Sequence, residues 1–506
     1  MSLPPRLLWL LALAFPISFV SRPVGAGDAP RPPNFVVVVA DDMSWDDAGF
    51  AGHPHIRTPN LDRLAREGLV FDLAFLTISS CSPSRASILT SRYPHRTGAE
   101  ELHWPIPSNA HLFVDNLRDH GYWVGAAGKW HLGDAMIDRF DNVLQTDTSG
   151  FQLPSGATAD NAKFRETLEG DARSGCADWI PLLRSRPDAR PFFVWLAALD
   201  PHRPYDQNAD SFSHEPNSVR LPPYHPDTDK TRQDYLAYYE EIHRLDRFVG
   251  LVVDELEHQS ASENTVVIFL SDNGRPFPRD KTTLYDSGIR TPFIVRWPEV
   301  IPPGSRAPGL ISSVDIGPTL LELAGAAPLS NSDGRSFAGV LTEPSLPARE
   351  WVFAEKNWHD FEDHSRMVRG ERYKLIQNHY ADLPNTPPAD AVRSPTYQEM
   401  LRLEQTEGEQ SLARQYHLTT RRPFEELYDL ESDPHETRNL ALEPRYASVL
   451  ERLRGALAGW ETATGDYAPT RRTADEFDRI SGAPTAPRVR PRWSRESMLR
   501  AGLIAP

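Results

Sequence analysis

The sequence predicts an α/β protein with a doubly wound, mostly parallel sheet. Apolar runs occur at 34–40, 191–198 and 264–270, and their lack of polar alternation is typical of strands buried on both faces. A shorter run lies at 122–125, and polar or ionisable residues follow each run. A segment with helical spacing at 233–258 separates two of these strands. Strands that alternate with helices favour parallel pairing.

Other segments fit the same layout. We expect a helix at 61–68, strands at 70–75 and 291–297, and a helix at 314–324.

The character of the chain then changes. A hairpin at 366–376 that turns at Gly370, a strand at 426–430 and a helix at 446–460 predict a smaller C-terminal α+β domain containing an antiparallel sheet. The end of the chain, rich in Arg, Pro and Ser, is expected to lie on the surface or to be disordered. The predicted division is a signal peptide at 1–26, a catalytic domain at 34–345, a C-terminal subdomain at 346–470 and a tail at 471–506.

Residues 1–26 have the pattern of a secretory signal peptide, with Arg6, an apolar run at 7–20 and a small-residue end. A retained membrane anchor is the alternative, although the run is short for a full span. We expect a secreted or periplasmic protein, or a lysosomal-type location in a eukaryote. With only Cys81 and Cys176, such a chain has no disulfide framework, although one bridge stays possible.

The formal net charge of −16 and the pI of about 5.5 argue against a broad nucleic-acid-binding surface. No segment after the signal peptide is apolar enough for a predicted membrane span. An acidic protein can still bind an anion where cationic groups or a metal gather in one pocket.

One cysteine has a sequence context typical of an anion site. Cys81 lies in a small polar turn and begins a helix-compatible run, with Arg85 four residues later on the same face. Backbone N–H groups and the positive end of the helix dipole would stabilise an anion there. The alternative is a buried, unreactive cysteine.

Two oxygen-rich pairs follow two predicted strands: Asp41 with Asp42, and Asp272 with Asn273. Open α/β sheets place their sites at the carboxyl ends of the strands, so we expect these pairs to meet. Carboxylate and amide oxygens suit a hard divalent cation, and Ca²⁺, Mg²⁺ and Mn²⁺ all stay open by residue type. Turn formation or helix capping is the alternative for either pair alone.

Cationic side chains complete the predicted site. Lys129 and His131 follow one strand, His202 follows another, and Lys281 lies farther along the chain. With Arg85 they supply positive charge for a tetrahedral anion and a group that moves protons near neutral pH. A lone histidine is more often a surface or capping residue. The residue types together predict an exported α/β hydrolase with a metal-bound, cation-rich pocket for an anionic group.

Several motifs resemble the type I sulfatases, which share the alkaline-phosphatase-like α/β fold. The resemblance covers most of residues 34–300. Its motifs are Cys-x-Pro-x-Arg at 81–85 and the segments 91–98, 40–42, 58–62, 128–133 and 271–274.

This resemblance implies cofactors and roles at the matched positions. The cysteine at position 81 would be oxidised to Cα-formylglycine by a formylglycine-generating maturation enzyme. The implied ligands of one Ca²⁺ ion are Asp41, Asp42, Cys81, Asp272 and Asn273. The implied catalytic residues are Cys81, Arg85, Lys129, His131, His202 and Lys281.

The resemblance also implies a reaction sequence. One hydroxyl of the hydrated aldehyde attacks sulfur and the leaving group departs, after which the second hydroxyl loses a proton and sulfate is eliminated. On this basis His131 is the base in sulfate elimination, and His202 or Lys281 assists the leaving group. A metal and fixed cations stabilise the charge that develops during such a reaction.

Within this family the chain is more similar to the sulfamidases, which act on N-sulfoglucosamine in heparan sulfate. Two positions depart from the sulfamidase pattern, and both bear on the choice of substrate. Lys281 stands where an arginine is expected, and residues 43–45 stand where a glycine-rich segment is expected after Asp42. The motifs that carry the likeness are 79–87, 200–203, 271–278 with 284–285, and 433–440.

The favoured function is therefore an exported, Ca²⁺-dependent sulfatase that acts on sulfated glycans, preferably N-sulfoglucosamine of heparan sulfate or heparin. The alternatives are an O-sulfatase on another sulfated polysaccharide or an aryl sulfate, a phosphonate or phosphate ester hydrolase of the same fold, and a catalytically silent glycan-binding relative. The expected partners are the glycan and the maturation enzyme, without nucleic acid, and a homodimer is compatible with the sequence.

Overall fold

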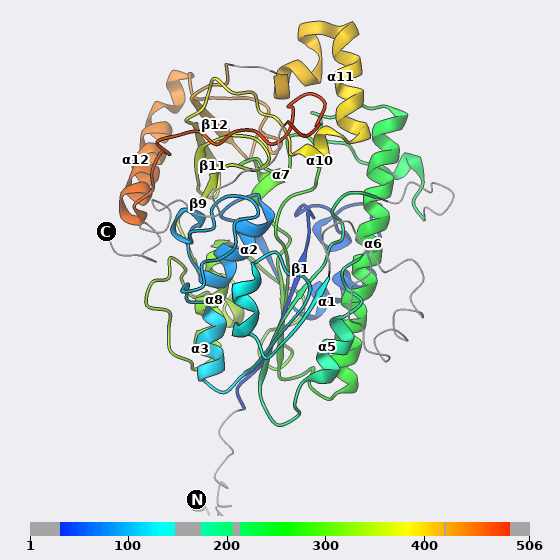
Figure 1. Cartoon of the computed structure of the whole chain (residues 1–506), viewed down its shortest axis with the longest axis vertical. Helices are drawn as coiled ribbons and strands as arrows, with labels where there is room; N and C mark the ends of the chain where they lie inside the picture. Colours follow the sequence, from blue (N-terminus) through cyan, green and yellow to red (C-terminus); the bar gives the residue numbers. More distant parts are fainter. Residues whose placement is uncertain (1–30, 147–173, 206–212, 419–420, 486–506) are drawn as a thin grey trace, which may run out of the picture. The chain divides into compact units, whose positions relative to one another are not determined.

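A mixed, mostly parallel sheet of eight strands organises the fold, in the order β4-β3-β5-β1-β6-β7-β2-β8 (Figure 1). Only β7 runs against the others, because it pairs antiparallel with both β6 and β2 while the other neighbours pair in parallel. The predicted fold class is confirmed. The strands are β1 Asn34–Ala40, β2 Leu69–Phe75, β3 Trp123–Lys129, β4 Asn142–Thr146, β5 Phe192–Ala197, β6 Thr265–Ser271, β7 Ile294–Arg296 and β8 Ser305–Ser312.

Helices cover both faces of this sheet (Figure 1). On one face lie α1 Pro59–Glu67, α5 Trp179–Ser185 and α6 Asp229–His258. On the other lie α2 Cys81–Thr90, α3 Phe113–Asp119 and α8 Ile316–Ala324.

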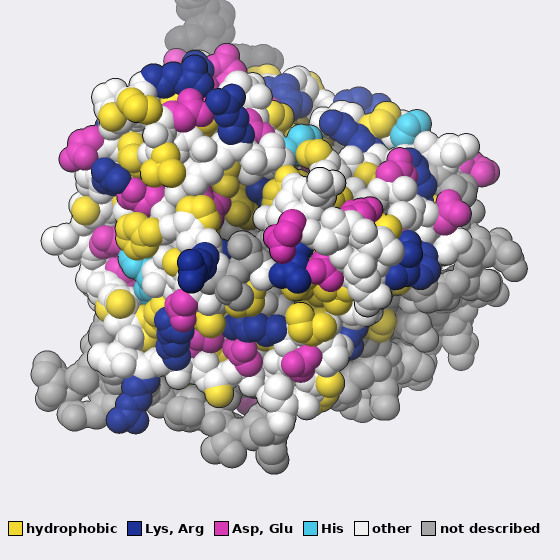
Figure 2. Space-filling model, turned by 90° about the horizontal axis from the view of Figure 1, so that it is seen from above, with side chains coloured by type: hydrophobic (Ala, Val, Ile, Leu, Met, Phe, Trp, Pro, Cys, Tyr) yellow, Lys and Arg dark blue, Asp and Glu magenta, His cyan; other side chains and the backbone are white. Residues whose placement is uncertain are grey.

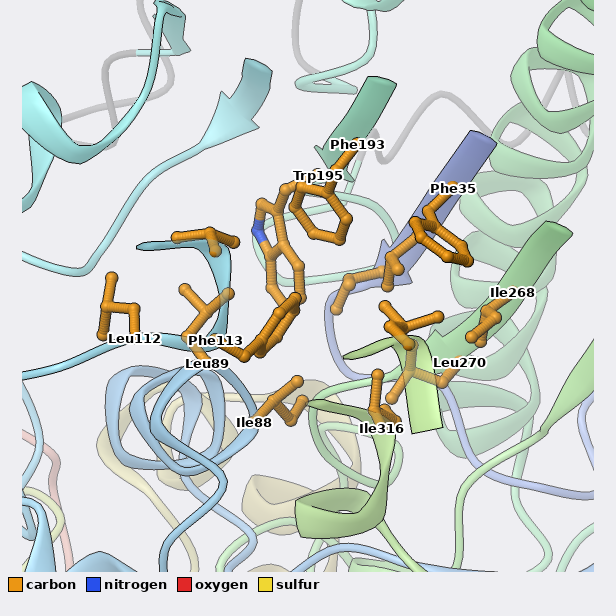
Figure 3. Packing of buried hydrophobic residues seen from close by; sticks show 14 of the residues in the cluster. Phe35, Ile88, Leu89, Leu112, Phe113, Phe193, Trp195, Ile268, Leu270 and Ile316 are labelled. Carbon is orange, nitrogen blue, oxygen red and sulfur yellow. The ribbon is translucent and has the colours of Figure 1, made fainter. Parts of the chain in front are cut away.

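The β1 strand illustrates why the sequence folds into these layers. Successive strand side chains point to opposite faces, so Val36 and Val38 join the core beneath α6 whereas Val37 and Val39 join the core beneath α2. Each of these valines is fully buried, which stabilises the fold by about 1.5–3 kcal/mol per side chain. Figure 3 shows the second core, where strand residues such as Trp195 meet helix residues from α2, α3 and α8.

A second, antiparallel sheet of four strands has the order β12-β11-β10-β9. Leu453 and Trp460 of α12 pack on residues of this sheet such as Val368, and a separate cluster joins Met367 to Phe75 at the end of β2. The predicted hairpin is confirmed, with its turn at Gly370. The elements are β9 Val352–Lys356, β10 Ser365–Arg369, β11 Tyr373–Asn378, β12 Glu425–Asp429 and α12 Ala447–Thr464, together with α7 Asp286–Ile289, α9 Ala338–Thr342, α10 Ala389–Val392 and α11 Pro395–Glu407.

This computed structural model describes residues 31–146, 174–205, 213–418 and 421–485. The predicted signal peptide and the end of the predicted tail lie outside these ranges, and the predicted domain boundaries stay predictions. In the described part of the tail, Ala474 O accepts a hydrogen bond from Trp358 Nε1 at 3.1 Å, so this segment packs on the C-terminal region. Among the helices described, none has the length and apolar character that crossing a bilayer requires.

Candidate active site

The carboxyl ends of β1 and β6 bring the two predicted oxygen-rich pairs together. These strands pair in parallel with Ala40 beside Ser271, so the residues that follow each strand emerge side by side. The backbone N–H of Asp42 donates to Asp272 Oδ1 at 3.3 Å, and Asn273 Nδ2 donates to Asp42 Oδ1 at 3.0 Å. The four residues whose oxygens were predicted to bind a metal ion therefore form one cluster.

Cys81 is the first residue of α2, as predicted, and its helix begins against this cluster. Its thiol is 2% exposed and lies 3.5 Å from Asp41 Oδ1. Arg85, one turn later, donates from Nε to Asp272 Oδ2 at 2.7 Å and from NH1 to Lys129 O at 3.0 Å. Arg85 thus ties the start of α2 to the ends of β6 and β3.

The acidic cluster fits a divalent cation. Ligand atoms of Asp41, Asp42, Cys81 and Asp272 all lie within 4.8 Å of one another, and all four residues are buried. Asn273 Oδ1 is also buried and has no hydrogen-bond partner among the described residues, so its lone pairs are available to a cation. Crowded buried carboxylates are costly without a compensating charge, and this oxygen-rich set suits a hard metal ion.

Burial and neighbouring charges shift the pKa values of these groups in different directions. Burial raises the pKa of Asp42 to about 7 and that of Asp272 to about 6. Burial would also raise the pKa of Asp41, but Lys129 and other cations lower it well below its usual range. Burial raises the pKa of the Cys81 thiol, which as a protonated thiol is a poor nucleophile.

The cations of the predicted site are buried inside the protein. On the face seen in Figure 2, Lys and Arg side chains alternate with Asp and Glu, and no patch of one sign dominates. By contrast, Lys129 is 4% exposed and pairs with Asp41, while Lys281 is 1% exposed and its Nζ lies 2.7 Å from Asp42 Oδ2. Burial would lower the pKa of both lysines, but the neighbouring carboxylates raise it, so both ammonium groups stay charged.

The two predicted histidines also reach the site. His131 Nε2 is 2.7 Å from His103 Nδ1, and burial beside Lys129 lowers the pKa of His131 well below its usual value. His202 Nε2 is 3.7 Å from Asp42 Oδ2, and burial beside Lys281 lowers the pKa of His202 to about 4.

A pocket of about 290 Å³ opens onto these groups. Cys81, Lys129, His131, His202 and Lys281 line it, and Arg85 is not part of the lining. The other residues that line the pocket are not predicted from the sequence. They stand in no motif, and only tertiary packing brings them together. The missed lining residues are Leu102, His103, Leu199, His359, Asp360, Ala389, Asp390, Arg393 and Phe477.

Two other features lie apart from this pocket. Cys176 is buried in the core beneath α6, and neither Cys81 nor Cys176 is in a disulfide, so the bridge left open by the sequence does not form. A larger cavity of about 850 Å³ near His53, His55 and His214 contains none of the predicted site residues in its lining.

Comparison with known proteins agrees with this geometry. A family model described as Sulfatase matches residues 33–326, and one described as N-sulphoglucosamine sulphohydrolase, C-terminal, matches residues 277–418. The first range contains every residue of the candidate site that the sequence predicted.

Individual relatives and a solved structure extend the likeness over most of the chain. An ulvan-active sulfatase of Formosa agariphila is 31% identical over 87% of this chain and 76% of the relative. N-sulphoglucosamine sulphohydrolase of Homo sapiens is 33% identical over 86% of this chain and 91% of the relative. One similar solved structure is described as a complex with its substrate D-glucosamine-2-N,6-O-disulfate. The match includes 87% of this chain and 99% of the other chain, with a TM-score of 0.65 and 19% sequence identity, and it shows a shared fold. By its family match and these identities, the chain belongs to the sulfatase family of hydrolases.

Proposed function

We propose that this protein removes the N-sulfo group from a glucosamine residue at the end of a heparan sulfate or heparin chain. The observation that carries the proposal is the meeting of Cys81, two buried lysines and two histidines around one pocket beside an acidic cluster. Such a pocket combines a site for a nucleophile, positive charge for a tetrahedral anion and groups that transfer protons.

Three similarities support an N-sulfated amino sugar as substrate. The C-terminal family model carries the name of N-sulphoglucosamine sulphohydrolase, and the human enzyme of that name is 33% identical. The solved structure noted above holds an N-sulfated glucosamine. The pocket volume of about 290 Å³ is at the lower end of the range for ligand pockets, which favours one terminal sugar over an internal stretch of the chain.

We propose Ca²⁺ as the metal of the acidic cluster. The residues that would hold it are Asp41, Asp42, position 81, Asp272 and Asn273. The buried, unpartnered Asn273 Oδ1 supports a ligand at this position. When bound, the ion would supply positive charge against the oxygens of the sulfuryl group.

We also propose that Cys81 is converted to Cα-formylglycine. The Cys-x-Pro-x-Arg motif supports this, and so does the environment of the thiol, because a buried protonated thiol is a weak nucleophile. The hydrated aldehyde would supply a hydroxyl nucleophile.

The remaining site residues bind and orient the reacting groups. Lys129 and Lys281, charged and buried, would bind the sulfuryl oxygens. His131, kept neutral by burial, would take a proton from position 81. His202 or Lys281, whose Nε2 and Nζ lie 3.7 Å and 3.6 Å from Asp390 Oδ2, would assist the departing nitrogen, and Arg85 would hold Asp272 in place.

A sulfate-release panel with matured protein tests the proposal. We expect the highest kcat/KM with N-sulfoglucosamine, lower values with 6-O-sulfated glucosamine and aryl sulfate, and formylglycine in the peptide across position 81. Turnover of O-sulfates alone would exclude the sulfamidase function, and an unmodified thiol in active protein would exclude formylglycine.

An O-sulfatase acting on another polysaccharide is the second candidate. The ulvan-active relative, 31% identical, favours it. Release of sulfate from ulvan oligosaccharides but not from N-sulfoglucosamine would select this function. A phosphonate and a phosphate ester added to the panel would identify a hydrolase of those esters, and glycan affinity without turnover of any substrate would identify a silent glycan-binding protein.

We further propose export, with residues 1–26 removed as a signal peptide. N-terminal sequencing of protein recovered outside the cytoplasm tests this. A homodimer stays a proposal that light scattering can check.

A further inference from the structure

Asp390 is a carboxylate in the pocket that the predicted chemistry does not use. It lies in α10, and its Oδ1 accepts the backbone N–H of Ala391 at 2.7 Å. Its Oδ2 is buried and has no hydrogen-bond partner among the described residues. This oxygen lies 3.6 Å from Lys281 Nζ and 3.7 Å from His202 Nε2. A buried acceptor without a donor is costly, so Oδ2 is suited to a donor that arrives with a ligand.

Two segments of the C-terminal region hold the helix that carries Asp390 in place. Asp360 Oδ2 accepts the backbone N–H of Ala389 at 2.9 Å, next to Asp390 in the chain. Arg393 donates to Gly482 O at 2.8 Å, which fixes the residue after α10. The carboxylate is therefore part of a supported pocket wall.

The position of Asp390 relative to the cations decides which part of a substrate it can meet. Lys281 Nζ lies 2.7 Å from Asp42 Oδ2 and 3.6 Å from Asp390 Oδ2, and ligand atoms of Asp42, His202 and Asp390 lie within 4.8 Å of one another. Asp390 is thus the carboxylate of the C-terminal region that lies beside the acidic cluster. The sulfuryl group must reach position 81, where the proposed nucleophile would form, and Lys129 and the proposed Ca²⁺ would offset the carboxylates of the acidic cluster there. Asp390 would then face the atom that leaves sulfur.

The charge on that leaving atom differs between substrate classes. In N–S cleavage a proton delivered to the sulfamate nitrogen makes that nitrogen cationic, the nucleophile oxygen forms a bond to sulfur, and the S–N bond breaks with its electron pair on nitrogen to leave a neutral amine. A second proton, taken from solvent, converts this amine to the ammonium that is stable at neutral pH. In O–S cleavage the leaving oxygen takes one proton and ends as a neutral alcohol. A fixed carboxylate stabilises developing positive charge on nitrogen and has no such effect on oxygen.

We propose that Asp390 is a specificity-determining residue that accepts a hydrogen bond from the nitrogen leaving group and so favours cleavage of N-sulfated over O-sulfated substrates. This inference rests on the proposed N-sulfoglucosamine activity. Burial would raise the pKa of Asp390, but Lys281, His202 and Arg203 lower it below its usual range, so the group is a carboxylate.

The test compares the wild-type protein with Asp390→Asn, which keeps the shape and removes the charge. We expect kcat/KM for N-sulfoglucosamine to fall about 10²-fold and that for 4-methylumbelliferyl sulfate to change less than about threefold. Asp382→Asn, which removes an exposed carboxylate of the C-terminal region, is the matched control and should alter neither value. Formylglycine content and Tm are measured for each variant.

Equal losses on both substrates, or no loss on either, would overturn the role of Asp390 while leaving the proposed function intact. A wild-type protein that cleaves only the aryl sulfate would overturn both.

A binding measurement covers the case in which Asp390→Asn does not fold. Glucosamine, which carries an ammonium, should inhibit the wild-type protein at least about tenfold more strongly than N-acetylglucosamine, which carries none. Equal inhibition by the two sugars would contradict an ammonium-facing carboxylate.

Discussion

The pocket has two walls that differ in origin. The inner wall, at the carboxyl ends of β1, β3 and β6 and the start of α2, carries the acidic cluster, Cys81 and the buried lysines. The outer wall, from the C-terminal region, carries His359, Asp390 and Phe477. The inner wall fits the chemistry of a sulfuryl group, whereas the outer wall has the residues that would meet the rest of a substrate. Changes in the inner wall should therefore abolish turnover, and changes in the outer wall should alter substrate choice and binding.

The largest effect is expected at Cys81. Replacing it by Ala removes the proposed precursor of the nucleophile, so sulfate release should fall at least about 10⁴-fold with every substrate. Cys176→Ala is the control, because this cysteine lies in the core beneath α6, and it should keep its turnover with a slightly lower Tm. Sulfate release per mole of purified protein measures the turnover of both variants. Residual turnover above a few per cent in Cys81→Ala would show that the inner wall works without this residue.

The next effect concerns the acidic cluster. Removing the proposed Ca²⁺ with a chelator should lower sulfate release about 10³-fold and lower Tm, since an ion that binds the folded state at 100 times its Kd stabilises it by about 2.7 kcal/mol. Asp272→Asn should reduce the Ca²⁺ dependence of Tm. Differential scanning fluorimetry across a calcium series measures the shift. Identical melting with and without calcium would argue against a metal at the inner wall.

A smaller effect is expected at Phe477. This residue is 9% exposed and lies below the guanidinium of Arg393, whose Cζ is 5.5 Å from the ring centroid. Phe477→Ala should raise KM for N-sulfoglucosamine about tenfold with kcat within about twofold, because an apolar contact with the sugar is lost in ground and transition states alike. Phe424→Ala, which removes a 53% exposed ring, is the control. A fall in kcat at constant KM would assign Phe477 to the chemical step.

The smallest effect concerns the contact between the two regions. His95, from the predicted segment 91–98, has its Nδ1 2.9 Å from Glu355 Oε1 of β9 and 3.8 Å from Asp466 Oδ1. Burial and the nearby Arg366 lower the pKa of His95, but the two carboxylates outweigh them and raise the pKa above its usual value.

Because the folded-state pKa exceeds the unfolded value, protonation of His95 stabilises the folded protein. That stabilisation is complete below about pH 6.5 and is lost as pH rises through the folded-state pKa. The wild-type Tm should thus fall a few degrees more between pH 6 and pH 8 than that of His95→Gln. His120→Gln, at an exposed position, should follow the wild type. Parallel pH profiles for all three proteins would exclude this contribution.

The sequence predicts the inner wall better than the outer one for a physical reason. The strands β1, β5 and β6 carry apolar runs without polar alternation, and parallel strands bring the residues that follow them to one edge. The local sequence therefore predicts both the strand and the place of the carboxylate that follows it, as at Asp41 and Asp272.

The outer wall has no such local signature. His359, Asp390 and Phe477 lie far apart in the chain, and each stands in a loop or a short helix whose position depends on tertiary packing. Two of the missed strands have a related cause: β4 and β8, at the two edges of the main sheet, contain polar and partly exposed residues, so no buried apolar run marks them. Sequence patterns indicate burial, and residues that are only partly buried escape them.

The burial of α2 has a consequence for how an active molecule is made. All ten residues of this helix, Cys81 included, are buried in the folded protein. If Cys81 is oxidised as proposed, the maturation enzyme must reach the motif while the chain is still unfolded, so folding and oxidation would compete in time. Protein produced in a host without enough of that enzyme would fold normally, pass every test of stability, and remain inactive, because adding the enzyme afterwards would find its target enclosed.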